Sequence, residues 1–168
     1  MTIRILESGD ATAYQAFRLD ALRACPEAFG STYEEEVQLT ASEIEARVRP
    51  AADQFILGAF EPEERLIGVV GMIRPTRTKR RHGAQIWGMY VAAEARGRGV
   101  GNALLSDLIR RVRQLEGVLQ VHLSVITSCQ SARRLYVAHG FEPYGTEPRA
   151  HMQNGALLDI EHMILRLN

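Results

Sequence analysis

The chain is poor in the features that mark secreted and membrane-spanning proteins. Of its 168 residues only two are cysteine, Cys25 and Cys129, and they stand far apart, outside any Cys-x-x-Cys pair. Such sparse cysteine is typical of reduced thiols in the cytoplasm and not of a secreted disulfide scaffold. The longest run of apolar residues and glycine, Leu66 to Ile73, is far shorter than the roughly 20 residues that span a bilayer. We therefore expect a cytoplasmic protein without a membrane partner.

An excess of one charge is also missing. The chain carries 20 basic and 20 acidic side chains, so it has no overall field that gathers nucleic acid or an anionic membrane. The basic run from Arg77 to Arg81 has no interleaved aromatic residues, and a solvated loop explains it better than an RNA-binding patch. The histidines form no His-x3-His or His-Glu-x-x-His set. We therefore expect neither a nucleic-acid partner nor a metal site.

The composition is that of an ordinary globular protein, with 46% hydrophobic and 24% charged residues. The length favours a single domain over residues 1–168 with one core. Apolar periodicity, capping residues and turn residues predict strands over 2–7, 54–60, 66–73, 84–91, 119–126, 141–144 and 159–167, helices over 10–24, 40–49, 99–117 and 131–139, and an irregular segment over 27–39. This order predicts an α/β fold with a mixed sheet of six or seven strands, antiparallel in its first part and flanked by about four helices.

The most informative segment follows the strand predicted over 84–91. It reads Arg96-Gly97-Arg98-Gly99-Val100-Gly101-Asn102 and leads directly into a helix. Glycines let the backbone approach a ligand closely, and a helix start offers unpaired N–H groups with a partial positive charge. The segment therefore predicts a phosphate-binding loop rather than a plain turn. It is not a P-loop, because no Lys-Ser/Thr follows Gly101, and Asn102 stands where a dinucleotide fingerprint has its third glycine.

Two blocks of the sequence resemble the GNAT superfamily of N-acetyltransferases. Arg96 to Gly101 matches its Arg/Gln-x-x-Gly-x-Gly/Ala motif, and Ala132 to Phe141 looks like its Ala-x-x-Leu-Tyr-x-x-x-Gly-Phe segment. The spacing of the blocks and the predicted element order also match, so the resemblance covers nearly the whole chain. It implies the acetyltransferase fold, a homodimer, and transfer of an acetyl group from acetyl-CoA to a primary amine of a small molecule or peptide by direct attack in a ternary complex.

The resemblance also implies cofactor-binding positions. Backbone N–H groups along Arg96, Gly97, Arg98, Gly99, Val100, Gly101 and Asn102 would bind the pyrophosphate of acetyl-CoA. The end of the preceding strand, at Met89, Tyr90 and Val91, would pair with the pantetheine arm, with Ser131 as a further contact. The thioester would then lie between the strands predicted over 84–91 and 119–126.

Tyr136 is the predicted catalytic residue, because the family's tyrosine at this place protonates the departing thiolate. A tyrosine of ordinary pKa, about 10, holds its proton at neutral pH and can donate it. The same ring can also pack its helix onto the sheet. The family often has an asparagine seven residues earlier, but this chain has Cys129 there. That departure removes the asparagine side chain from the expected cofactor contacts.

The group that deprotonates the attacking amine is left open. A lysine-like amine, with a pKa of about 10.4, is neutral in only about one molecule in 2,500 at pH 7. Several family members use a glutamate six residues before the position of Val91, but Gln85 stands there and cannot act as a base. Three alternatives remain. The base is a carboxylate of the acidic run Glu34, Glu35 and Glu36, or it is His122 on the strand over 119–126, or a water relay takes the proton without a single base.

The acceptor pocket is expected after the first helix, where the family often forms it. The candidate substrate-binding residues are Phe29, Tyr33, Glu34, Glu35 and Trp87. Trp87 is either a core residue or a wall of this pocket, and the carboxylates favour a cationic acceptor unless they form only a solvated loop. The departures at Gln85 and Cys129 support an alternative function, a non-catalytic acyl-CoA sensor or interaction module.

Overall fold

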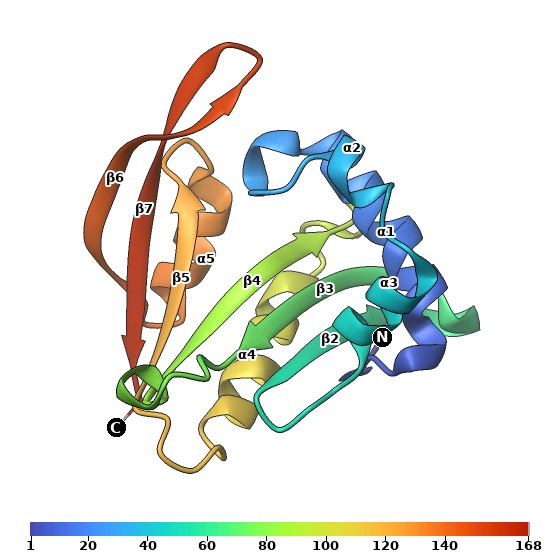
Figure 1. The fold of residues 1–168 in the computed structure, drawn as a ribbon, viewed down its shortest axis with the longest axis horizontal. Helices are drawn as coiled ribbons and strands as arrows, with labels where there is room; N and C mark the ends of the chain where they lie inside the picture. Colours follow the sequence, from blue (N-terminus) through green and yellow to red (C-terminus); the bar gives the residue numbers. More distant parts are fainter. Residues whose placement is uncertain (168) are drawn as a thin grey trace.

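The computed structural model describes residues 1–167, which build a seven-stranded sheet that opens between its fourth and fifth strands in sequence (Figure 1). The strands are β1 (Thr2–Ile5), β2 (Gln54–Phe60), β3 (Leu66–Ile73), β4 (Gly83–Val91), β5 (Gln120–Ile126), β6 (Glu142–Gln153) and β7 (Ala156–Arg166). They are ordered β1-β2-β3-β4-β5-β7-β6. Pairing is antiparallel except between β4 and β5, which run parallel. The mixed α/β sheet expected from the sequence is confirmed.

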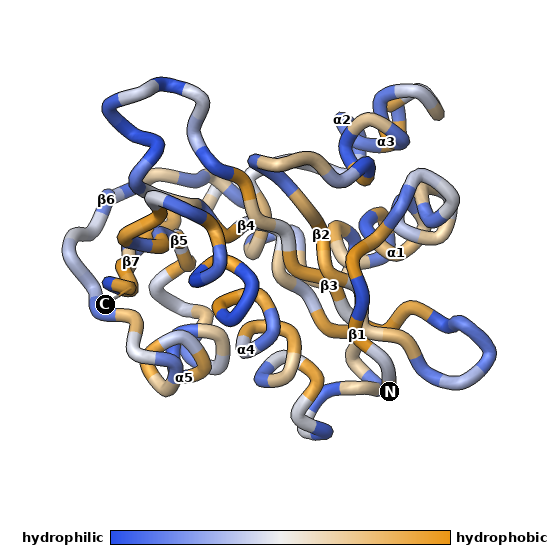
Figure 2. Tube along the Cα trace, turned by 90° about the horizontal axis from the view of Figure 1, so that it is seen from below, coloured by the Kyte–Doolittle hydropathy of each residue, from blue (hydrophilic) through white to orange (hydrophobic). Residues whose placement is uncertain are grey.

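Helices cover both faces of the sheet. They are α1 (Ala11–Ala24), the single turn α2 (Tyr33–Glu36), α3 (Ala41–Val48), α4 (Val100–Val112) and α5 (Gln130–Ala138). In Figure 2 the hydrophobic strands β2 to β4 lie between α1 and α3 on one side and α4 on the other. Alternation along β2 explains this arrangement, because Ile56 joins the cluster with Tyr14 and Val48, whereas Leu57 joins the cluster with Leu104. Within residues 1–167 no helix is long and apolar enough to cross a membrane.

The opening in the sheet begins early on β4. Only residues 83–85 of β4 pair with residues 120–122 of β5. Further along, Gly88 has φ +62°, and the register between β3 and β4 shifts beside it. A glycine reaches this conformation at little cost, so it permits a bulge that bends the strand. As a result β4 and β5 diverge towards their carboxyl ends, and the edge of each strand is left unpaired there.

Four predicted segments differ from the structure. The helix predicted over 99–117 ends at Val112, because the residues after it form turns that lead to Gly117, whose φ is +73°. The irregular segment over 27–39 contains α2, whose first turn Thr32 and Glu35 close as a capping box. The short closing strands over 141–144 and 159–167 are parts of a long hairpin, β6 and β7. Register shifts and the positive φ of Arg149 (+57°) break the alternation along β6 by which strands are predicted.

Candidate active site

The loop from Arg96 to Asn102 presents a row of free backbone donors. Gly97 and Gly99 have φ +73° and +80°, a left-handed conformation that favours glycine. In the described chain the backbone N–H groups of residues 97–102 donate to no backbone acceptor, and the first bond of α4 runs from Ala103 N–H to Gly99 O at 3.0 Å. Free N–H groups at the positive end of a helix form a site for a phosphate group. This geometry fits a diphosphate.

The side chains of the loop mostly contact neighbouring protein groups and so stabilise the conformation of the loop. Arg96 Nε donates to the carbonyl of Val91 at 3.0 Å, and its guanidinium lies 5.3 Å from the Tyr90 ring. Arg98 forms an ion pair with Glu61 at 2.6 Å, so its charge is shared with a carboxylate. The Val100 side chain is buried in the core. The backbone of the loop is therefore the part that is available to a ligand.

The start of α4 packs tightly against α5 and β4. A Cβ on Gly101 would lie 3.3 Å from Leu135 Cδ2 and 3.5 Å from Met89 Cε, which leaves little room for any larger residue. Asn102 Oδ1 is 2.9 Å from Nε2 of His139, the residue that follows α5. Ser131 is exposed in the first turn of α5. These contacts fix the glycine loop relative to the helix that carries Tyr136.

Tyr136 lies at the opening between β4 and β5. A cavity of about 80 Å³ occupies this opening, and Met89, Trp87, Ser124, Cys129 and Tyr136 are among the residues that line it. The Tyr136 hydroxyl donates to Met89 Sδ at 3.7 Å. Burial, together with the nearby Cys129, raises the pKa of Tyr136 to about 12. Its hydroxyl is therefore protonated at neutral pH and has only a weak thioether acceptor.

The three predicted cofactor residues of β4 face different sides of the sheet. Met89 and Val91 pack against the core cluster beneath α4, whereas Tyr90 packs against Phe17 and Phe29 on the other face. Because β5 has already diverged, their backbone groups on that edge are not paired with it. An extended ligand chain with amide groups could pair with such an edge.

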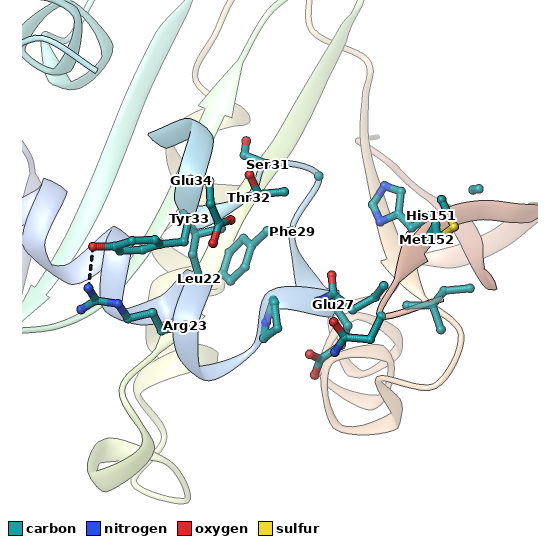
Figure 3. Close-up of a pocket in the computed structure, with 16 residues that line it drawn as sticks. Leu22, Arg23, Glu27, Phe29, Ser31, Thr32, Tyr33, Glu34, His151 and Met152 are labelled. Atoms are coloured by element: carbon teal, nitrogen blue, oxygen red, sulfur yellow. Dashed lines mark hydrogen bonds between the residues drawn. The ribbon is translucent and has the colours of Figure 1, made fainter. Parts of the chain in front are cut away.

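A larger cavity, of about 610 Å³, lies between the segment after α1 and the β6–β7 hairpin. Figure 3 shows Phe29, Tyr33 and Glu34 on one wall and His151 and Met152 on the other. The two other predicted substrate-binding residues do not line it. Trp87 lines the smaller cavity at Tyr136, and the Glu35 carboxylate accepts the Thr32 N–H at 2.8 Å as part of the cap of α2.

Sequence reasoning missed the hairpin wall of this cavity and one acidic residue, Glu27. Because the strand was expected to end at residue 144, His151 and Met152 were not considered. One sequence signal was available, since Met152 stands alone between His151 and Gln153 in a polar run, and in the structure its side chain is 73% exposed. Exposed large apolar side chains of this kind often mark a binding surface.

One candidate for the base is excluded by its surroundings. Glu36 is only 3% exposed, and its carboxylate accepts Arg18 Nη2 at 2.9 Å and Arg47 Nη1 at 2.7 Å. Burial opposes its charge, but the hydrogen bonds and charges of the two arginines outweigh burial and hold its pKa below the usual value. A carboxylate so stabilised does not take up a proton near neutral pH. Glu36 is a structural ion-pair residue.

The other base candidates lie in two different places. Glu34 is exposed at the large cavity. His122 lies in a groove of about 390 Å³ with Gln85, its pairing partner on β4, and does not line the cavity at Tyr136. Burial, with Arg80 and His82 nearby, lowers the pKa of His122. Within residues 1–167 we find no group of three or more His, Cys, Asp and Glu side chains arranged to hold a metal ion.

Solved structures with this fold include several bacterial acetyltransferases. A GNAT-family acetyltransferase from Streptococcus pneumoniae is 26% identical, with a TM-score of 0.86 over 98% of both chains. A phosphinothricin acetyltransferase from Sinorhizobium meliloti, solved with acetyl-CoA, is 24% identical, with a TM-score of 0.84 over 99% of this chain and 88% of the other. The acetyltransferase yncA from Salmonella typhimurium, also solved with acetyl-CoA, is 22% identical, with a TM-score of 0.79 over 100% and 94% of the two chains. These likenesses agree with the fold expected from the sequence.

Sequence comparison leads to the same family. A search of curated proteins gave no match, but the model of the acetyltransferase (GNAT) family matches residues 15–141. This region covers most of the chain and includes both the glycine loop and Tyr136. As a member of the acetyltransferase (GNAT) family, the chain is an N-acetyltransferase that uses acetyl-CoA.

Proposed function

We propose that the chain transfers the acetyl group of acetyl-CoA to a primary amine of a small molecule or peptide, by direct attack of the amine on the bound thioester. The observation that carries this proposal is the opening between β4 and β5. It lies between the free N–H groups of the glycine loop and the wide cavity walled by the β6–β7 hairpin. Donor and acceptor can therefore bind at the same time, which a ternary complex requires.

The donor is held mainly by backbone groups. The N–H groups of residues 97–102 bind the diphosphate, and the unpaired edge of β4 at Met89 to Val91 accepts the amide groups of the pantetheine arm. In this pose the thioester lies in the small cavity lined by Met89 and Tyr136. No side-chain charge is needed there, so the partial neutralisation of Arg98 by Glu61 does not weaken the site.

Tyr136 serves as the acid. As the new N–C bond forms and the C–S bond breaks, the sulfur leaves as a thiolate and receives the proton of the Tyr136 hydroxyl. That hydroxyl already points at a sulfur atom, Met89 Sδ, and gives up only a weak hydrogen bond when it turns to another. Burial keeps the phenol protonated until the thiolate appears.

The acceptor enters through the large cavity. Carboxylates of Glu27 and Glu34 line it, beside the rings of Phe29 and Tyr33. A cationic amine with an apolar body suits such a lining, because the carboxylates attract the ammonium form and the rings cover the carbon chain. The lining supports a small polyamine-like or lysine-like acceptor.

The test is release of coenzyme A thiol from acetyl-CoA in the presence of a panel of primary amines. We expect turnover with at least one cationic amine, and a loss of about 100-fold or more in kcat for Tyr136→Phe, as is typical when a general acid is removed. Thermal stabilisation by acetyl-CoA is measured on both proteins and should persist. An unchanged kcat removes Tyr136 from the mechanism. Tight acetyl-CoA binding without turnover on any amine supports the non-catalytic sensor instead.

A further inference from the structure

Three polar side chains form a hydrogen-bonded chain across β5, β7 and β6. Ser124 Oγ lies 2.9 Å from His162 Nδ1, and His162 Nε2 lies 3.3 Å from Glu147 Oε2. Ser124 and His162 are directly paired in the β5–β7 register. Neighbouring strands therefore hold the first contact in place, and the contact does not depend on a flexible loop.

This series of hydrogen-bonded side chains begins with Ser124, at the opening in the sheet. Ser124 lies two residues beyond His122, the last residue of β5 that pairs with β4. It lines both the small cavity at Tyr136 and the groove that contains His162. Val125 and Leu123 point into the core beneath α4, so Ser124 faces the opposite side of the sheet. A reactant in the small cavity can therefore reach the Ser124 hydroxyl.

We propose that Ser124, His162 and Glu147 form the relay that takes the proton from the acceptor amine, with His162 as the base. The proposal rests on the proposed acetyl transfer and supplies the base that Gln85 cannot provide. His162 on β7, beyond β5, would then serve as the base in place of the glutamate that several family members have on β4. Imidazole suits this task, because one ring nitrogen can accept a proton while the other donates its own N–H to a carboxylate.

The orientation of the ring gives the direction of proton flow. Glu147 accepts the N–H of Nε2, which leaves the Nδ1 lone pair to accept the Ser124 O–H. The Ser124 oxygen then accepts an N–H of the amine. One proton passes from the ammonium nitrogen to Oγ while the Ser124 proton passes to Nδ1. The products are a neutral amine and an imidazolium paired with the Glu147 carboxylate.

The surroundings allow the relay to reset. The His162 side chain is 30% exposed and that of Glu147 is 59% exposed, so the proton can leave to water. Tyr144 from β6 packs against the His162 ring, with the ring centroids 6.0 Å apart, and also against His122. The remaining charged or titratable groups of the groove are His122 on β5 and, from the segment before β4, Arg80 and His82. Glu147 is the anion in contact with the imidazole.

The experiment compares His162→Gln with wild type on two amines, a strongly basic alkylamine and an amine whose own pKa lies below neutrality. The alkylamine needs a base and the weak amine does not. We expect kcat/KM at pH 7 to fall by about 100-fold or more for the alkylamine and by less than about tenfold for the weak amine. Ser124→Ala and Glu147→Gln should show the same selective loss, which keeps the test informative if one variant does not fold.

The matched control is Glu142→Gln. Glu142 is also exposed on β6 and pairs with Arg166 of β7 at 2.9 Å, but it does not contact His162. It should retain wild-type kcat/KM on both amines. An equal loss on both amines in His162→Gln, or no loss on either, overturns the relay. A wild-type protein without turnover on any amine overturns the proposed acetyl transfer as well, whereas an active wild type with an active His162→Gln overturns the relay alone.

Discussion

Tyr136 on α5 and Met89 on β4 meet at the opening between β4 and β5, with the phenol oxygen 3.7 Å from the thioether sulfur. The contact joins a helix that follows β5 to a strand that has separated from β5. A thioether is a weak acceptor, and so the hydroxyl is protonated, buried and almost without a hydrogen-bond partner in the described structure. Such a group is costly to ionise and ready to donate.

The first prediction concerns stability at high pH. Burial raises the pKa of Tyr136 from 10 to about 12, so above pH 10 the unfolded chain loses this proton while the folded chain keeps it. The contribution of the protonated Tyr136 to the free energy of unfolding is therefore fully present below pH 10 and is lost as the pH rises through 12. Two pKa units correspond to about 2.7 kcal/mol at most. Urea unfolding between pH 9 and 12 should show a steeper decline for wild type than for Tyr136→Phe, and parallel curves would contradict the burial argument.

The second prediction concerns the glycine loop. Gly99→Ala places a Cβ at φ +80° with no atom within 4 Å of it, so the cost is one of backbone conformation alone. We expect the free energy of unfolding to fall by about 1 kcal/mol, and acetyl-CoA to bind more weakly because the loop shifts. Gly145→Ala is the control, since its site is equally open and its φ is ordinary. Calorimetric titration with acetyl-CoA measures the affinity, and equal Kd values for both variants would contradict the prediction.

The sequence predicted those elements around the candidate site that depend on local pattern. The alternating glycines before a helix and the block around Tyr136 are contiguous, and each predicts its element and its neighbours along the chain. The central strands were predicted for the same reason, since residues such as Val69 and Val70 are buried on opposite faces and read as a continuous apolar run.

What the sequence could not predict depends on pairing between distant residues. The acidic run Glu34 to Glu36 looks uniform, but only Glu36 is buried, because Arg18 and Arg47 approach it from two other helices. Ser124, His162 and Glu147 become neighbours only through the register of β5, β7 and β6. No periodicity within one segment carries that information. The long strand β6 is exposed and interrupted by bulges, so it lacks the alternation of apolar and polar residues from which a strand is predicted.

The third prediction concerns Glu36. Replacing it by Gln leaves two guanidinium groups without their shared carboxylate, and Arg18 is itself only 5% exposed. Breaking a buried pair in this way costs about 3–5 kcal/mol. Because the pKa of Glu36 is held below its ordinary value, its ionised carboxylate favours the folded state at neutral pH, and this pH-dependent part of the stability is lost as the pH falls through the lowered pKa. Urea unfolding of Glu36→Gln at pH 7 should show the loss, while the exposed neighbour Glu35→Gln should stay within about 1 kcal/mol, the scale of a lost cap.

The fourth prediction concerns how the acceptor is selected. Glu34 lines the large cavity and is exposed, so its carboxylate can attract an ammonium group without holding the fold together. Glu34→Gln should raise KM for a dicationic amine by about twofold to fivefold, the scale of one exposed charge pair, and leave kcat nearly unchanged because no bond to the reacting atoms is lost. A monocationic amine of the same length should be less affected, and added salt should reduce the difference. Glu45→Gln, an exposed substitution on α3 outside this cavity, is the control. An equal KM for both amines in wild type and Glu34→Gln would show that the carboxylate plays no part in recognition.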